Sequence, residues 1–360
     1  MASGPLEIAI VGCGRFSDEH VKEIRKIDVA SVVAACDREP LLAEQLAERY
    51  SIPHHYSSLA EMFLEIKPDI VHIITPPKTH LQIGSYACER GSHIYVEKPF
   101  TVNYPEAVQL LDVAARHNRK VTVGHIYHFD PAAQQMRALV RTGVLGEPVH
   151  VEAVMSYDLE TEFGKAFQYD SNHWIYSLPG GLFQNVISHL VERVLEFLPD
   201  ESPSVEVQAF LRNPALRKEE SRILDELRVM LAGKEVTAQL TFSSNFKPAH
   251  SFLRIYGTKS TVEVDFNSQA VILRRGKQLP TGVGRIMSGL SIARQYQKAG
   301  FRNINRFLRS DFHFFAGMNY LLRAFYSCVM DNTEPPIPYR DILRTTGIMD
   351  LIFERLPQPA

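Results

Sequence analysis

A short loop near the N-terminus, residues 12–17 (GCGRFS), constrains the fold of this chain more than any other feature. It follows the apolar run 6–11 and opens a helical stretch over about residues 18–26. An apolar run that ends in glycine is typical of a buried parallel strand. In a Gly-x-Gly-x-x-Gly loop, the first glycine makes a tight turn and the second lets the backbone approach a pyrophosphate. Ser17 stands in the third glycine position and is small enough for close packing of the helix on the strand.

An acidic residue follows the second apolar run, 29–36, as a dinucleotide site requires. Asp37 comes twenty residues after Ser17 and is placed to accept hydrogen bonds from a ribose hydroxyl pair. The phosphates would meet the N-terminus of the helix after the loop, where free N–H groups favour an anion. Asp37 would repel a 2′-phosphate, which favours NAD, whereas the neighbouring Arg38 leaves NADP open.

Strand and helix patterns alternate through the first third of the chain. We expect strands at 6–11, 29–36, 70–75, 93–96 and 120–124, with helices at 18–26, 40–50, 59–65, 80–90 and 105–117. This order predicts an α/β domain of residues 1–125, a doubly wound parallel sheet of the Rossmann type with helices on both faces.

The pattern changes after residue 125. Helical 131–141 precedes the strand-like run 149–156, in which Val149, Val151 and Ala153 alternate with polar residues. The run 236–242 alternates in the same way, and runs 253–256 and 262–266 flank a turn at 257–260. Alternation is typical of a sheet that is covered on one face. Residues 126–360 are therefore expected to form an α+β domain with a mostly antiparallel sheet.

Composition excludes several classes of protein. The 360 residues include 39 basic and 41 acidic side chains, an ordinary globular balance that gives no reason to expect nucleic-acid binding. The four cysteines lie far apart, so neither a metal site nor a disulfide framework is expected. The sequence shows neither a secretory signal nor an apolar run long enough for a transmembrane span. We therefore expect a cytoplasmic protein.

A lysine motif, Glu97-Lys98-Pro99, follows the strand predicted at 93–96, and Thr75-Pro76-Pro77 follows the preceding strand. Both lie at the carboxyl edge of the sheet, where ligands bind in such folds. At this point the chain resembles the Gfo/Idh/MocA family, the glucose–fructose oxidoreductase and inositol dehydrogenase group, over residues 6–270. The matching features are the GxGxxx loop, His20, Asp37, Thr75-Pro76-Pro77 with His80, Glu97-Lys98-Pro99, Gly180-Gly181 and His189.

The resemblance implies a Rossmann domain, an open-faced antiparallel sheet domain and a nicotinamide cofactor between them. It also implies oxidation or reduction at a secondary alcohol of a sugar, sugar nucleotide or polyol. The motif lysine of the family contacts the nicotinamide ribose and the reacting oxygen, which assigns that role to Lys98. An ammonium group stabilises a developing alkoxide and assists proton transfer. A lysine buried near the cofactor would have a lowered pKa that suits this role.

The chain departs from the family pattern where the acid/base pair is expected. The family has Asp-x-Gly-x-His on a helix, whereas here Asn185 replaces the aspartate and Ile187 the glycine. Asparagine holds a hydroxyl group but carries no proton at neutral pH, so His189 is predicted to move the proton. Packing of His189 between helix and sheet, without a chemical role, is the structural alternative.

Three further residues are candidates for substrate binding. Tyr127 and His128 follow the last predicted strand of the first domain, which places them near the nicotinamide. Related enzymes often carry arginine where His128 stands. Trp174, the only tryptophan, precedes Gly180-Gly181 and is interpreted as a wall for the sugar or as a core residue.

A basic stretch lies between Phe266 and Ser310. It contains nine basic residues and no acidic one, and apolar residues interleave with them at nearly helical spacing. Three interpretations stay open: a solvated or inter-subunit helix face, an anion site for a nucleotide sugar, and a membrane-surface helix over residues 286–309.

The sequence thus predicts an NAD(P)-dependent oxidoreductase, a homo-oligomer formed through the second domain. Rival interpretations are a cofactor-binding sensor without turnover and a dehydrogenase of a non-sugar substrate. Lys98, His189 and Asn185 are the predicted catalytic residues, and Tyr127, His128 and Trp174 join the last two in substrate binding. The predicted cofactor contacts are Gly12, Gly14, Arg15, Phe16, Ser17, Asp37, Arg38, Thr75, Pro76, His80, Glu97 and Lys98.

Overall fold

The computed structural model describes residues 4–170, 173–213, 217–218, 221–222, 224–275 and 280–357. The chain forms two compact units. The first comprises residues 1–126 and 317–347, and the second comprises residues 127–316 and 348–360.

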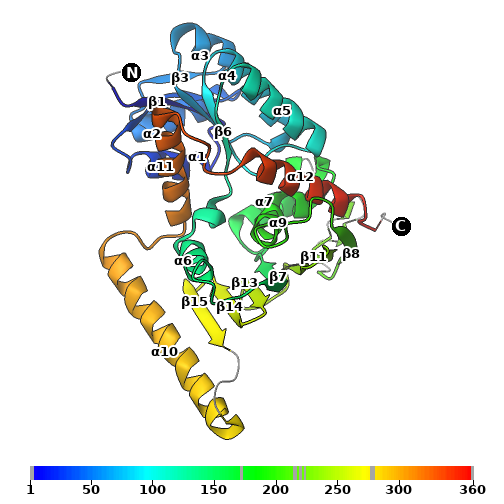
Figure 1. Ribbon diagram of the computed structural model, residues 1–360. Coiled ribbons are helices and arrows are strands. Elements are labelled where there is room, and N and C mark those ends of the chain that lie inside the picture. Colours follow the sequence, from blue (N-terminus) through cyan, green and yellow to red (C-terminus); the bar gives the residue numbers. More distant parts are fainter. Residues whose placement is uncertain are drawn as a thin grey trace. The chain divides into compact units, whose positions relative to one another are not determined.

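A parallel sheet forms the centre of the first unit (Figure 1). Its order is β3-β2-β1-β4-β5-β6, and every neighbouring pair is parallel. Every residue of the central strand β4 is buried, as in a sheet covered on both faces. The strands are β1 (Leu6–Val11), β2 (Ala30–Cys36), β3 (His54–Tyr56), β4 (Ile70–Ile73), β5 (His93–Val96) and β6 (Val121–Val123).

Local signals set the ends of several helices in this unit. Ser58 caps α3 by accepting the N–H of Ala60, and Asn103 caps α5 by accepting the N–H of Glu106. The helices are α1 (Ser17–Ile24), α2 (Pro40–Tyr50), α3 (Leu59–Glu65), α4 (His80–Glu89), α5 (Tyr104–Arg116) and α11 (Ala316–Asp331), with a 3-10 turn η1 (Pro77–Thr79). Helix α12 (Tyr339–Phe353) begins in this unit, and its residues from 348 onward belong to the second unit.

The strand order reverses at β1, which pairs with β2 on one side and β4 on the other. Ligands of open α/β sheets bind outside the carboxyl ends of the strands at such a switch point. Residue 12 follows β1, residue 74 follows β4 and residue 97 follows β5. The fold therefore brings the glycine loop, the Thr75 loop and the Lys98 motif to one edge of the sheet.

The second unit contains a mostly antiparallel sheet of order β15-β14-β13-β7-β12-β11-β8, in which only β7 and β12 pair in parallel. Helix α9 packs against β7 and β12, and α6 packs against β14 and β15. The strands are β7 (Pro148–Ser156), β8 (Ser204–Phe210), β11 (Glu226–Ala232), β12 (Thr237–Ser243), β13 (Ser251–Gly257), β14 (Ser260–Asp265) and β15 (Ala270–Arg275), beside a short pair β9 (Arg217–Lys218) and β10 (Ser221–Arg222).

Helices of the second unit cover one face of this sheet, while the other face is polar. On that polar face Arg254 forms ion pairs with Glu152 and Glu263, both at 3.0 Å. The helices are α6 (Pro131–Val140), α7 (Glu162–Tyr169), α8 (Gly181–Val186), α9 (Ser188–Leu195) and α10 (Thr281–Leu308), with 3-10 turns η2 (Ile126–Phe129) and η3 (Trp174–Ser177).

These sheets confirm the predicted fold class, and three details differ from expectation. Val149 was expected in the core but is 47% exposed near the start of β7, unlike Val151 and Ala153. Residues 317–347 were assigned to the second domain and pack with the first unit instead. Strands β3, β8, β11 and β15 were not expected: β3 carries no apolar run, whereas β15 begins with the apolar run 270–273, which the sequence analysis did not assign to a strand. Lys277 of the basic stretch lies outside the described residues.

Candidate active site

The glycine loop has the geometry that its sequence predicts. Gly12 has φ +95°, and a Cβ atom there would lie 2.8 Å from the Ile74 carbonyl group, so only glycine fits. Gly14 is different, because a Cβ atom there would meet no atom within 4 Å. Packing of the protein therefore does not require glycine at position 14. Close approach of a ligand to the backbone would require it, as in dinucleotide loops.

Asp37 ties this loop to the end of β2. Its Oδ2 atom accepts the N–H of Cys13 at 2.7 Å, and Oδ1 accepts the N–H of Glu39 at 3.0 Å. A carboxylate has about four acceptor sites, so both oxygens can accept further hydrogen bonds from ribose hydroxyl groups. Arg38 next to it is exposed. The carboxylate and this loop fit the adenosine half of a dinucleotide.

Ser17 and Phe16 begin helix α1. Ser17 is fully buried and its hydroxyl donates to the Gly14 carbonyl, which agrees with a packing role for the small third residue. Phe16 precedes the helix as its N-cap residue and lies edge-on to His20 at 5.3 Å. Arg15 lies in the same loop and is exposed.

His80 holds the loop that follows β4 in place. Its ring is fully buried, with Nε2 at 2.8 Å from the Thr75 carbonyl oxygen and Nδ1 at 3.0 Å from that of Phe100. Burial lowers the pKa of His80, against the raising effect of these carbonyl groups. Both ring nitrogens face protein acceptors, so His80 offers neither to a ligand and orients the loop of Thr75 and Pro76.

Glu97, the first residue of the lysine motif, is buried. Its Oε1 atom lies 3.1 Å from His20 Nε2, and Oε2 accepts the N–H of Lys98 at 3.1 Å. A Cβ atom at Gly124 would lie 2.7 Å from this carboxylate, so glycine at that position makes the space for it. These contacts give Glu97 a role in holding the backbone of Lys98.

A chain of hydrogen bonds continues from Glu97 into the core of the first unit. His20 Nδ1 lies 2.9 Å from His72 Nδ1, and His72 Nε2 lies 2.9 Å from the Tyr326 hydroxyl. The two rings and the hydroxyl group thus form one continuous hydrogen-bonded chain from Tyr326 to Glu97. Burial lowers the pKa of His72, which agrees with a neutral ring. The sequence did not point to His72 or Tyr326.

Lys98 follows Glu97 at the carboxyl end of β5 and is half-buried. Burial lowers the pKa of Lys98, and the neighbouring Glu97 carboxylate opposes this effect. A lysine with a lowered pKa at a ligand-binding edge is typical of a functional site.

In the second unit, Asn185 and His189 lie at the junction of two short helices. Gly180, before α8, packs on Phe353, because a Cβ atom there would lie 2.4 Å from that ring. Asn185 is the second-to-last residue of α8, and His189 is the second residue of α9. Ile187 between them is fully buried in the core, which explains an apolar residue where the family has glycine. Asn185 and His189 are four residues apart along a nearly continuous helical path.

Tyr127 packs on His189, with ring centroids 4.7 Å apart at 79°. His128 is held differently, because its Nδ1 lies 2.8 Å from Nη2 of Arg137, which itself pairs with Glu196. Burial and the Arg137 charge lower the pKa of His128 to about 3. His128 is therefore neutral at physiological pH, and its predicted role in substrate binding is limited to Nε2.

Two charged residues of α9 were missed by the sequence analysis. Glu192 follows His189 by three residues on the same side of the helix, and burial raises its pKa to about 8. Arg193 is 4% exposed, stacks on Tyr127 and Phe266, and donates from Nη1 to the Ser251 hydroxyl at 3.2 Å. Its Nε and Nη2 atoms have no hydrogen-bond partner among the described residues. Charged residues within the apolar run around Leu190–Leu195 are the signal that could have identified them.

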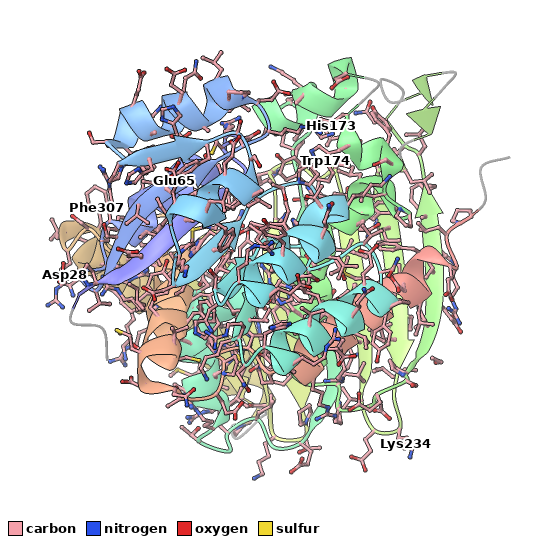
Figure 2. All side chains as sticks on the ribbon, turned by 90° about the horizontal axis from the view of Figure 1, so that it is seen from above. Asp28, Glu65, His173, Trp174, Lys234 and Phe307 are labelled. Atoms are coloured by element: carbon pink, nitrogen blue, oxygen red, sulfur yellow. The ribbon has the colours of Figure 1, made fainter. Side chains whose placement is uncertain are left out.

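Trp174 begins the turn η3 and is half-buried against the core of the second unit. Figure 2 labels it beside His173, whose ring centroid lies 5.2 Å away at 33°. Partial burial against the core is compatible with both interpretations made from the sequence.

The fold and this set of residues define a Rossmann-type dinucleotide-binding unit joined to an α+β unit. Residues 6–125 match the oxidoreductase family with the NAD-binding Rossmann fold, and residues 133–263 match the C-terminal domain of Gfo/Idh/MocA proteins. The chain therefore belongs to the Gfo/Idh/MocA family of oxidoreductases, as the sequence predicted.

Relatives and solved structures agree with this assignment. D-glucoside 3-dehydrogenase of Escherichia coli (strain K12) is 32% identical over 148 residues, 41% of this chain and 42% of the relative. The chain thus aligns with less than half of the length of that relative. The WlbA dehydrogenase of Bordetella pertussis, solved with NADH and UDP-GlcNAcA, has a TM-score of 0.78 at 18% identity and covers 100% of this chain and 99% of its own. The myo-inositol 2-dehydrogenase of Lactobacillus plantarum has a TM-score of 0.72 at 18% identity, covering 98% and 97%.

Proposed function

We propose that this protein is an NAD(P)-dependent dehydrogenase that acts on a secondary alcohol, or reduces the ketone, of a sugar, sugar nucleotide or polyol. The observation that carries the proposal is Lys98, half-buried at the carboxyl end of β5 with a lowered pKa. Its backbone is held by a carboxylate that is itself held through three buried residues. The names of the E. coli D-glucoside 3-dehydrogenase and the inositol dehydrogenase support the substrate class.

Each residue has a chemical task in the proposed oxidation. The bound nicotinamide supplies a hydride acceptor at C4. Lys98 donates a hydrogen bond to the reacting oxygen and stabilises the negative charge that develops as the C–H pair leaves. His189 takes the hydroxyl proton on an imidazole nitrogen, and Asn185 orients the substrate through its amide. Reduction of the ketone reverses these transfers.

We further propose that the cofactor is NAD rather than NADP. Asp37 presents a carboxylate at the end of β2, and it holds the loop through Cys13. A 2′-phosphate beside this carboxylate would meet a like charge. Gly12, Gly14 and Ser17 are assigned to the pyrophosphate, and Arg15, Phe16, Thr75 and Pro76 to the edges of the site. Calorimetric titration with NAD⁺ and NADP⁺ tests the preference, and tighter binding of NADP⁺ would contradict it.

The assay for this function uses the full chain with a panel of UDP-sugars, free sugars and inositols. Reduction of NAD⁺ is followed by absorbance at 340 nm for the wild type, Lys98→Ala and Lys67→Ala. Lys67 is an exposed lysine before β4, at the opposite edge of the same sheet. We expect turnover that is lost in Lys98→Ala and kept in Lys67→Ala. Nucleotide binding without turnover on any substrate would instead favour a sensor.

We also propose a cytoplasmic homo-oligomer that associates through the sheet of the second unit. The support is the half-buried face around Arg254, Glu152 and Glu263, which another chain could cover. The four cysteines are free thiols, which is compatible with a reducing compartment. A monomeric mass in light scattering at micromolar protein would contradict the oligomer.

A further inference from the structure

Helix α10 is attached to the rest of the second unit by one face. Figure 1 shows it running beside β15 at the edge of the sheet. Ala299 is 4% exposed and packs with Ala270 and Ile272. Gln295 pairs with the backbone of Leu273, accepting its N–H at 2.8 Å and donating to its carbonyl at 3.1 Å. These contacts fix which face of α10 points toward the sheet.

The opposite face is apolar and exposed. Leu290 and Leu308 each lie nine residues from Ala299, which is two and a half helical turns, so they point away from the sheet. They are 60% and 76% exposed. Each has an isoleucine four residues earlier, Ile286 and Ile304, on the same side of the helix. Phe307 of this helix is labelled at the rim of the view in Figure 2. The large apolar side chains exposed on α10 are Val283, Ile286, Met287, Leu290, Tyr296, Phe301, Ile304, Phe307 and Leu308. Patches of this size on a surface mark interaction sites.

The charge of this helix has a single sign. Its 28 residues include Arg285, Arg294, Lys298, Arg302 and Arg306 and no acidic residue, and Arg309 follows directly. Arg302 and Arg306 are used within the unit, where they contact Gln269 and Asp311. Arg294 and Lys298 are exposed on one flank of the apolar face.

We propose that α10 lies flat on an anionic lipid membrane, with its apolar face among the acyl chains and its flanking cations at the phosphate groups. An apolar face bordered by Lys and Arg is typical of interfacial helices. None of the described helices is long and apolar enough to cross a bilayer, so the helix lies in the interface. The absence of acidic residues from α10 favours an anionic partner over a second copy of the helix. In an antiparallel pair of copies, Arg294 and Lys298 of each helix would approach like charges near the centre.

Vesicle sedimentation of the full-length protein tests this surface. We expect the protein to sediment with phosphatidylcholine vesicles that contain about 30% phosphatidylglycerol, and to remain in the supernatant with phosphatidylcholine alone. Added salt should release it, because screening weakens the attraction to the anionic surface. Equal sedimentation with both vesicles, or with neither, would overturn the proposal.

Substitutions separate the apolar and the charged contributions. The double substitution Leu290→Glu with Phe301→Glu should lower the partition coefficient at least about tenfold, since two apolar anchors become charged. Leu64→Glu is the matched control, because Leu64 on α3 is 85% exposed and outside the patch. The pair Arg294→Gln with Lys298→Gln should lower binding to anionic vesicles about tenfold, and Lys67→Gln with Lys234→Gln should leave it unchanged.

A label on the helix distinguishes the membrane from a second copy. The native cysteines are buried, so an environment-sensitive fluorophore on Leu290→Cys reports this position. We expect a blue shift only when anionic vesicles are added, and unchanged dehydrogenase activity on free substrates for every surface variant. A blue shift without vesicles that grows with protein concentration, together with a dimer that Leu290→Glu dissociates, would assign the face to a second copy. This proposal stands independently of the proposed substrate.

Discussion

Two buried polar clusters of this protein differ in how their charges are compensated. In the first unit, the Glu97 carboxylate belongs to an ordered chain of hydrogen bonds that ends at Tyr326. In the second unit, Glu192 and Arg193 are adjacent on α9, and burial shifts the pKa of each toward its neutral form. The first cluster is satisfied by the protein. The second leaves donor atoms of Arg193 without a protein partner among the described residues.

The comparison shows two ways in which a protein uses buried polar groups. A satisfied network orients a neighbouring group, here the backbone of Lys98, and specifies one conformation. An incompletely satisfied cluster costs stability and is retained where function needs it. We therefore interpret the Glu97 chain as support for the backbone of Lys98, and the α9 cluster as a candidate part of the functional site.

Loss of the lysine should have the largest effect. Lys98→Ala is expected to lower kcat/KM by about a thousandfold or more, because it removes the charge that stabilises the developing alkoxide. The Kd for NAD⁺ should change far less, since the loop at Gly12 and Gly14 is untouched. Steady-state kinetics and calorimetry on the same samples measure both. A loss of the same size in Lys67→Ala would show that the assay reports folding rather than chemistry.

His189 comes next. His189→Asn keeps a polar side chain of similar size but removes the proton carrier, and should lower kcat about a hundredfold. His150→Asn is the control, because His150 pairs with Thr237 on the polar face of the sheet. If His189→Asn alters thermal stability but leaves kcat within about twofold of the wild type, packing is the role of this histidine.

Elements whose bounds depend on local signals could be predicted from the sequence. Helix α3 and strand β5 have the predicted bounds, because a serine cap precedes one and glycine and the lysine motif bracket the other. Strand β3 has three residues, two of them histidine, and carries no apolar pattern. Gly12 was expected to make a tight turn, and the structure shows it there with φ +95°.

Contacts between residues that are far apart along the chain could not be predicted from the sequence. His72 and Tyr326 are 254 positions apart, and neither lies in a motif. No periodicity reports such a pair, because each residue fits its own buried element without the other. Glu192 is an intermediate case. Its charge within an apolar helix was visible, but its pKa depends on burial, which only the fold determines.

Glu192 should make stability depend on pH. Its pKa is about 8 in the folded protein and 4.5 in an ordinary environment, so the folded state holds the proton that the unfolded state loses. Stability should therefore fall as pH rises from about 4.5 to 8. Glu192→Gln removes this effect and should be more stable than the wild type at pH 9 by on the order of 5 kcal/mol, with little difference at pH 4.5. Urea unfolding across this range measures it, with the exposed Glu48→Gln as control.

Tyr326→Phe should have the smallest effect and tests the other cluster. Without the hydroxyl, Nε2 of His72 loses its hydrogen-bond partner in a buried position, which costs about 1 to 3 kcal/mol. Thermal unfolding should therefore show a clear loss, and kcat should fall while KM for NAD⁺ stays constant, since Glu97 positions Lys98 rather than the nucleotide. Tyr56→Phe is the matched control, because its hydroxyl bonds Glu65 at the surface and its loss should cost less than about 0.5 kcal/mol. If both variants lost equal stability, with kcat unchanged, the chain would be ordinary core packing and the contrast with α9 would fail.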